Sequence, residues 1–280
     1  MPDTTHFIQR APRDVAGWAD CFDPATLPVL EDTAAALEDM RANEDAVDAH
    51  LLAEVVGIDP LMTLKLLAHV AGLRRGREGS DPETVTAALV MLGITPFFRA
   101  FGPQPTVEAR LASQPEAMRG FAQVLRRAHR AANFAIGFAV HRMDHDAAVI
   151  HEAALLHDFA ELLLWARAPA LALRIAERQQ LDPELRSAEV QRELLNIELA
   201  DLQHALMTAW RLPALLVHIT DDHGRSDVQV QNVLLAIRVA RHSANGWDNP
   251  ALPDDVLEVA DLLHLGNEPA LRLLREIDSD

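Results

Sequence analysis

A histidine and an aspartate stand side by side in the stretch AALLHDFAELLLW, residues 153–165. An imidazole nitrogen and a carboxylate oxygen together suit a hard or borderline divalent metal ion. Because neighbouring helical side chains diverge by about 100°, both could reach one metal only where a helix ends. The surrounding leucines predict burial, and a buried carboxylate needs a partner. His157 and Asp158 are therefore either metal ligands or a pair that hydrogen-bonds to each other and to nearby backbone.

A further histidine, His129, lies 28 residues before His157, within a predicted long helix over 116–142. Phe121, Leu125, Ala128, Ala132, Ala135 and Ala139 recur at the spacing that places apolar side chains on one helix face. His129 falls at the edge of that face. If the chain turns at HRMDHD, residues 141–146, and returns antiparallel, His129 can come to lie opposite His157. The alternative is a histidine at the edge of a helical core.

Two other clusters contain residues that bind ligands in proteins. His141, Asp144, His145 and Asp146 resemble a metal-ligand set, but their place between two helices favours Asp144 or Asp146 as the cap of the next helix. Arg74, Arg75 and Arg77 lie in the glycine-containing loop GLRRGREGSDP. They are a candidate site for a phosphate or an acidic partner, and the alternative is an ordinary solvated loop.

The elements that position these residues are predicted to be helices throughout, so the fold class is all-α. Ala, Leu, Glu and Arg dominate, and no segment shows sustained alternation of β-branched residues. Proline, glycine and capping residues divide the chain. The predicted helices are 29–42, 45–56, 60–72, 82–92, 95–102, 116–142, 146–157, 159–166, 168–178, 183–209, 213–222, 227–244, 252–263 and 267–277.

These helices suggest an order of domains along the chain. Residues 1–21 are predicted to be an irregular leader, because prolines interrupt them and their apolar positions share no face. Residues 22–112 form an N-terminal helical half, and 113–245 form a second half that opens with the long helix. Residues 246–280 form a C-terminal helical extension, separated by the linker GWDNPALPDD.

Composition excludes several classes of function. A net charge of −17 would repel a nucleic-acid backbone over most of the surface, so no nucleic-acid partner is expected. No apolar run reaches the roughly 20 residues of a membrane span. The single cysteine, Cys21, and an N-terminus without a basic-then-apolar pattern favour the cytoplasm.

A set of short motifs gives a family resemblance through its order and spacing along the chain. The motifs are LPVL at 27–30, IDPLMTLKLL at 58–67, AALVMLG at 87–93, His129, LLHDFAELLL at 155–164, WRLP at 210–213 and His223. Over about residues 22–245 the chain thus resembles the HDOD domain, the HD-related output domain of bacterial signalling proteins. The resemblance implies an N-terminal helical sub-bundle packed on a bundle related to HD-type phosphohydrolases, in proteins that act as regulatory modules.

Departures from the hydrolase pattern concern the metal ligands. The early histidine and the His-Asp pair of HD hydrolases map onto His129, His157 and Asp158, whereas the late aspartate falls on Arg241. A guanidinium repels a divalent ion, and it would pair favourably with Asp158 in place of the metal. After the dyad, Ala160-Glu161 stands where the family usually carries Gly-Lys, which replaces a phosphate-binding cation with a carboxylate.

We therefore expect a degenerate, non-catalytic HD site made of His129, His157, Asp158, His223 and Arg241, with no cofactor. The chain would act in signalling through protein partners and could sense a small ligand, such as a nucleotide, in the old cleft. The alternative is a metal-dependent phosphohydrolase. In that case His129, His157 and Asp158 would bind Fe, Mn or Ni, His223 would assist phosphate binding, and metal-bound hydroxide would attack a phosphoester.

Overall fold

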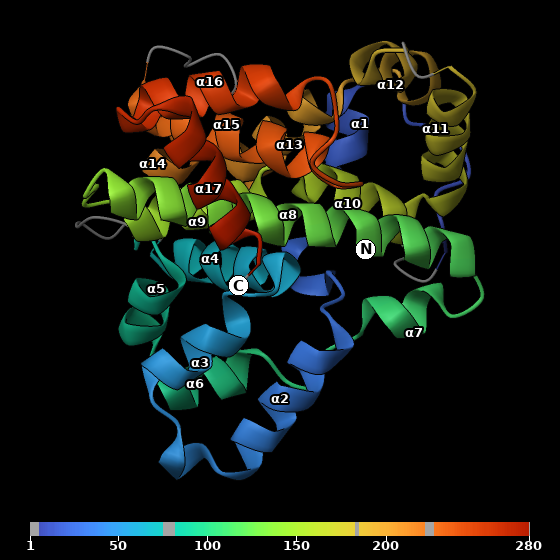
Figure 1. Ribbon diagram of the computed structural model, residues 1–280. Helices are drawn as coiled ribbons and strands as arrows, with labels where there is room; N and C mark the ends of the chain where they lie inside the picture. Colours follow the sequence, from blue (N-terminus) through green and yellow to red (C-terminus); the bar gives the residue numbers. More distant parts are fainter. Residues whose placement is uncertain (1–5, 75–81, 183–184, 222–226, 280) are drawn as a thin grey trace. The chain divides into compact units, whose positions relative to one another are not determined.

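The computed structural model describes residues 6–74, 82–182, 185–221 and 227–279 (Figure 1). In these segments the regular structure is helical, and a single isolated β-bridge joins Val29 to Thr106. The all-α prediction is therefore confirmed. Among the described residues, no helix combines the length and the apolar character that a membrane span requires.

The chain divides into two compact units, each assembled from two separate stretches of sequence. Unit 1 contains residues 1–123 and 158–213, and unit 2 contains residues 124–157 and 214–280. The long helix α8, Pro115–His141, contributes to both. Each unit is defined by which residues pack together, whereas the predicted domains are continuous stretches of sequence. The predicted boundaries at 112/113 and 245/246 are therefore not tested by this division.

Unit 1 is built from short helices that pack mainly on near neighbours in sequence. In Figure 1, α5 lies beside both α3 and α4, and α10 contacts α7, α11 and α13. The helices and 3-10 turns are α1 Val15–Ala19, η1 Pro24–Thr26, α2 Glu31–Ala42, η2 Glu44–Ala46, α3 Ala49–Val56, α4 Pro60–Leu73, α5 Val85–Leu92, α6 Ile94–Ala100, α7 Val107–Leu111, α10 Phe159–Arg167, α11 Pro169–Leu181, α12 Ser187–Leu195 and α13 Leu199–Ala209.

Two of the quoted motifs hold each other in place inside unit 1. Asp59 is fully buried, and its carboxylate accepts hydrogen bonds from the backbone N–H of Leu30, at 2.7 Å, and from Leu61 and Met62 at the start of α4. The buried Lys65 ammonium donates to the carbonyls of Ala25 and Leu27. Burial lowers the pKa of Lys65 to about 8. The residues of LPVL and IDPLMTLKLL thus stabilise the fold of unit 1.

The WRLP motif ends helix α13 in a common type of helix termination. Arg211 adopts a left-handed φ of 57°, and the N–H of Leu212 donates to the Met207 carbonyl at 2.9 Å. This is the six-to-one bond of a Schellman motif. Trp210 stacks at an angle on Phe159, with ring centroids 5.8 Å apart. WRLP therefore closes a helix and fills the core of unit 1.

Two predictions of secondary structure are wrong in detail. The predicted helix 183–209 is broken, because Asn196 takes a left-handed φ of 64° and ends α12 before α13 begins. The leader contains the short helix α1, which Asp14 caps through the Gly17 N–H. Trp18 of this helix is fully buried and donates from Nε1 to the Leu195 carbonyl at 2.9 Å.

Within the described part of the chain, unit 2 combines most of α8 with five further helices. Helix α15 packs against α9, α14 and α16, and α16 packs against α17. These helices are α9 Ala147–Leu156, α14 Ala214–Ile219, α15 Val228–His242, α16 Leu252–Leu263 and α17 Asn267–Ile277. The predicted apolar face of α8 is buried, apart from a half-buried Leu125, and His129 is half-buried at its edge as expected.

Two glycines of α8 give a matched test of packing. A Cβ on Gly120 would meet the Trp165 ring at under 3.0 Å, whereas a Cβ on Gly137 would meet the flexible end of Ile277. Gly120→Ala is expected to lower the free energy of unfolding by about 2 kcal/mol, because overpacking against a buried indole exceeds the gain in helix propensity. Gly137→Ala should leave it unchanged or slightly raised. Urea denaturation of both variants checks this, and equal effects would contradict it.

Candidate functional site

The His-Asp dyad lies at a junction between two helices. His157 is the C-terminal cap residue of α9, and Asp158 is the N-terminal cap residue of α10. The boundary between the compact units falls between these two residues, so that His157 belongs to unit 2 and Asp158 to unit 1. The Asp158 carbonyl accepts from the N–H groups of Glu161 and Leu162 at the start of α10.

The residues that follow the dyad have structural roles in unit 1. Ala160 is buried, so a small apolar side chain suits this position. Glu161 lies in the first turn of α10, where a carboxylate is stabilised by the helix dipole. Ala160 and Glu161 thus both suit their positions in the helix. The expected loss of phosphate binding, inferred from the family's usual Gly-Lys at these positions, stays a prediction.

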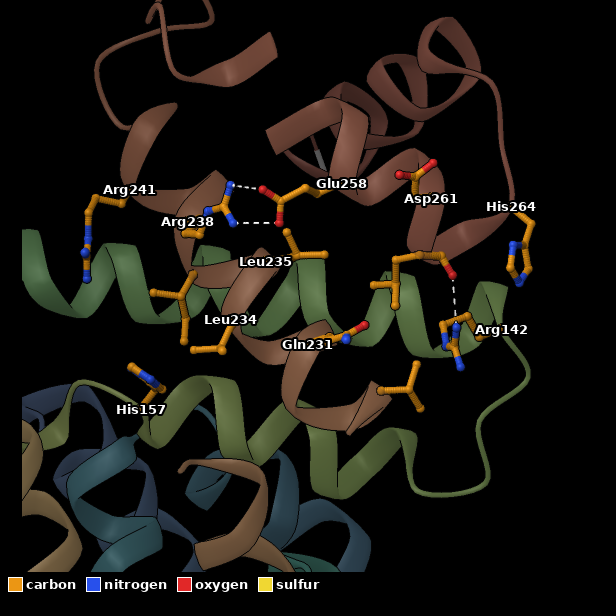
Figure 2. Close-up of a pocket in the computed structure, with 13 residues that line it drawn as sticks. Arg142, His157, Gln231, Leu234, Leu235, Arg238, Arg241, Glu258, Asp261 and His264 are labelled. Atoms are coloured by element: carbon orange, nitrogen blue, oxygen red, sulfur yellow. Dashed lines mark hydrogen bonds and ion pairs between the residues drawn. The ribbon is translucent and has the colours of Figure 1, made fainter. Parts of the chain in front are cut away.

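His157 lines a groove of about 840 Å³ in unit 2 (Figure 2). One wall is α15 and another is α16, and Arg142 at the end of α8 completes the lining together with His157. The lining residues are Arg142, His157, Val228, Gln231, Leu234, Leu235, Ile237, Arg238, Arg241, Glu258, Asp261, Leu262 and His264. The structure therefore brings together two of the predicted site residues, His157 and Arg241.

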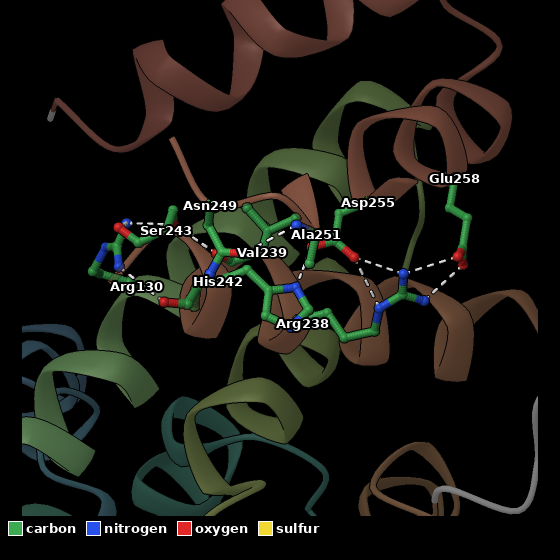
Figure 3. Close-up of polar contacts among 10 residues, drawn as sticks. Arg130, Arg238, Val239, His242, Ser243, Asn249, Ala251, Asp255 and Glu258 are labelled. Carbon is green, nitrogen blue, oxygen red and sulfur yellow. Dashed lines mark hydrogen bonds and ion pairs between the residues drawn. The ribbon is translucent and has the colours of Figure 1, made fainter. Parts of the chain in front are cut away.

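Arg238, in the wall of the groove, is held by two carboxylates of α16. Its guanidinium donates to Glu258 at 2.8 Å and to the fully buried Asp255 at 2.6 and 3.0 Å. The hydrogen bonds to Glu258 and Asp255 raise the pKa of Arg238. The other Asp255 oxygen lies 2.5 Å from Nδ1 of His242 (Figure 3). This Arg238–Asp255–His242 network fastens α16 to α15.

Arg130 makes a second connection on the same side of unit 2. Its guanidinium binds Asp278 at 2.7 and 2.9 Å, the Ala240 carbonyl at 2.9 Å and the Ser243 hydroxyl at 2.7 Å. Figure 3 shows Arg130 beside Ser243. The bonds tie α8 to the carboxyl end of α15 and to the residue that follows α17, so the C-terminal extension is an integral part of unit 2.

His129, the predicted early ligand, has His151 of α9 as an electrostatic neighbour. Burial lowers the pKa of His151, and the nearby His129 lowers it further. The lowered pKa favours the neutral form of His151, which is the form that binds metals and also the form that core histidines adopt. The predicted approach of His129 to His157 stays a prediction.

The described side chains do not fit a metal centre of the kind that HD hydrolases use. Within the described segments, no three or more His, Cys, Asp or Glu side chains come together as a set that could hold a metal ion. Arg241, a cation, lines the same groove as His157. His223 lies outside the described residues, and the pairing of Arg241 with Asp158 stays a prediction.

The HRMDHD turn leads into helix α9. Asp146 occupies the N-cap position of α9, but its side chain makes no capping hydrogen bond and instead accepts from Gln229 Nε2 at 2.7 Å. Asp144 accepts from Arg142 Nε at 3.2 Å. Asp146 is therefore the N-cap residue of α9, as predicted. Its carboxylate makes no capping hydrogen bond, because it is bonded to Gln229, and the Asp144 carboxylate is bonded to Arg142.

Of the arginine loop, the structure describes Arg74 alone, since Arg75 and Arg77 lie outside the described residues. Arg74 is the C-terminal cap residue of α4, and its guanidinium contacts the Met91 sulfur at 3.1 Å. This contact anchors the start of the loop. A phosphate or partner site in the loop stays a prediction.

Sequence reasoning missed the α15–α16 network and most of the groove. A signal existed, because Arg238, Arg241 and His242 follow the i, i+3, i+4 spacing on one helix, and Asp255 and Glu258 follow i, i+3 on the next. Such spacings place basic groups and carboxylates on single helix faces. They do not reveal which faces meet.

Comparisons with known proteins agree with this architecture. The model of the HDOD domain matches residues 27–226, and no curated protein matches the chain significantly. The MmoQ response regulator of Methylococcus capsulatus is similar with a TM-score of 0.65 at 19% identity, over 89% of this chain and 98% of that one. A virulence factor of Campylobacter jejuni gives 0.58 at 17%, over 85% and 84%. At these identities the likeness shows the fold.

In the described residues the regular structure is helical, and a His-Asp dyad lies at the junction of α9 and α10. The chain belongs to the HDOD family, because the family model covers most of its length. All residues that line the groove, except Arg142 and His157, lie after the end of that match at residue 226. The groove is therefore built largely by the part of the chain beyond the matched domain.

Proposed function

We propose that this protein is a non-catalytic regulatory module that acts through protein–protein contacts, with the groove beside His157 as a place for a signal to enter. The observation that carries the proposal is the presence of Arg241 in the same groove as His157. A guanidinium repels a divalent ion held in the same groove, and solvent exposure reduces this repulsion. A cation here works against a metal centre.

Family membership supports a regulatory role, since the resemblance to HDOD domains implies output modules. The MmoQ protein, which shares the fold over most of both chains, is described as a response regulator. In this proposal the chain passes a signal to a protein partner through its surface. The residues that correspond to the HD site, such as His129 and His157, contribute to packing and to ligand contact.

The competing function is a metal-dependent phosphohydrolase. The observation that favours it is the retention of His157 and Asp158 at a helix end, where both side chains can turn toward one ion. His129 would then supply a further imidazole. A bound metal would lower the pKa of a coordinated water and so produce hydroxide for phosphoester hydrolysis.

Metal analysis of protein purified without a chelator separates the two functions. We expect Fe, Mn and Ni well below one per chain and no hydrolysis of chromogenic phosphoesters above a buffer blank, with or without added metal. The matched variants are His157→Ala and His145→Ala, because His145 is exposed in the turn before α9. Stoichiometric metal that is lost in His157→Ala and kept in His145→Ala would overturn the proposal.

A further inference from the structure

We propose that the groove between α15 and α16 binds an organic anion, in which a phosphate or carboxylate is joined to an apolar body, and that Arg241 and His157 receive the anionic group. The inference rests on the proposed function in one respect, because both assign the groove as the place where a signal enters the protein. Binding can be measured whether or not the module regulates anything.

The size and floor of the groove suit a small molecule with an apolar part. Its volume of about 840 Å³ lies within the range of roughly 300–1,000 Å³ that is typical of ligand sites. Leu235 and Ile237 are buried beneath it, and Leu234 is half-buried. An apolar body laid here would remove its own hydrocarbon and the exposed part of Leu234 from water, at about 25 cal/mol for each Å².

The three arginines of the groove differ in their availability. Arg238 is engaged by Asp255 and Glu258, and Arg142 is engaged by Asp144 and the Leu262 carbonyl. For the exposed Arg241, no hydrogen bond or ion pair of the side chain is found within the described segments. Its planar guanidinium can bind a phosphate or a carboxylate in a bidentate manner.

The distribution of charge orients the ligand. Figure 2 shows Arg241 and His157 toward one end of the groove, with Asp261, Arg142 and His264 toward the other. The exposed Asp261 carboxylate would repel an anion at its own end. The anionic group is therefore placed at Arg241 and His157, and the body extends along Leu234 toward Gln231, whose amide can donate and accept hydrogen bonds.

The net charge of the chain sets a requirement on the ligand. At −17, the long-range field disfavours anions. A bare phosphate would have to bind through Arg241 and His157 alone, in contact with solvent. Tight binding therefore needs the apolar body. If Arg241 only stabilised the carboxyl end of α15 through the helix dipole, an apolar body on the ligand would not strengthen binding.

The test measures binding of three probes by calorimetry in a buffer with chelator: 1-naphthyl phosphate, 1-naphthoate and inorganic phosphate. We expect at least one naphthyl compound to bind, with inorganic phosphate at least tenfold weaker. The stronger of the two naphthyl probes identifies the anionic group. Arg241→Ala should weaken binding 10- to 100-fold, since charge-assisted hydrogen bonds are lost, and Leu234→Asn should weaken it severalfold.

The control is Arg272→Ala, which removes an exposed arginine of α17 that pairs with Glu268 away from the groove lining. Circular dichroism of each variant establishes that it is folded. The inference is overturned if neither naphthyl probe binds at millimolar concentration, if Arg241→Ala binds like the unchanged protein, or if inorganic phosphate binds as tightly as the naphthyl compounds. Because chelator is present, a metal found in the separate analysis would overturn the proposed function and leave this result standing.

Discussion

Asp59→Ala is expected to lower the free energy of unfolding of unit 1 by about 3 kcal/mol. The carboxylate lies fully buried and satisfies three backbone N–H groups, two at the start of α4 and that of Leu30. Burial raises the pKa of Asp59, although the hydrogen bonds from the backbone N–H groups act in the opposite direction. Alanine leaves the N–H groups without acceptors, and each unmet buried group costs about 1–3 kcal/mol.

Urea denaturation followed by circular dichroism measures this change, and two variants test its cause. Asp59→Asn keeps one acceptor oxygen for the α4 N–H groups but turns an amide N–H₂ toward Leu30, so an intermediate loss is expected. Asp48 caps α3 in the same way but is exposed. Asp48→Ala should therefore cost about 1 kcal/mol. A loss in Asp59→Ala no larger than in Asp48→Ala would show that the link to Leu30 contributes nothing.

Asp255→Ala is expected to lower the free energy of unfolding of unit 2 by about 3 kcal/mol. Asp255 is fully buried and joins Arg238 to His242 (Figure 3). Removing one partner of a buried ionic network leaves the remaining groups without compensation, which typically costs 3–5 kcal/mol. We take the lower end of this range because Arg238 keeps Glu258 and is about one-third exposed.

Hydrogen exchange locates the effect, since protection of the α15 and α16 amides should fall while that of α4 is unchanged. Asp254→Ala is the matched control, because Asp254 is adjacent and exposed. It should change stability by less than about 0.5 kcal/mol. Equal loss of protection in the two variants would contradict the role assigned to the network.

The helical fold and the family could be predicted because their signals are local. The start of α4 follows from Asp59-Pro60, a capping residue followed by a residue that fits the first turn. The buried face of α8 follows from apolar spacing. The break at Asn196 is harder to predict. Asn adopts the left-handed conformation more readily than most residues, but tertiary packing decides whether it does so inside a helical pattern.

For the candidate site, too, some features could be predicted from the sequence and others depend on the tertiary structure. The sequence by itself predicted that His157 and Asp158 lie at a helix end, and the structure places them there. The assignment of Arg241 to the late ligand position of HD hydrolases comes from the resemblance and stays a prediction. The tertiary structure decided that Arg241 lines a groove with His157, that Arg238 is engaged by α16, and that His129 neighbours His151. The reason is physical: caps and helix faces depend on residues within one or two turns, whereas a groove depends on which faces meet, and many distant contacts settle that together.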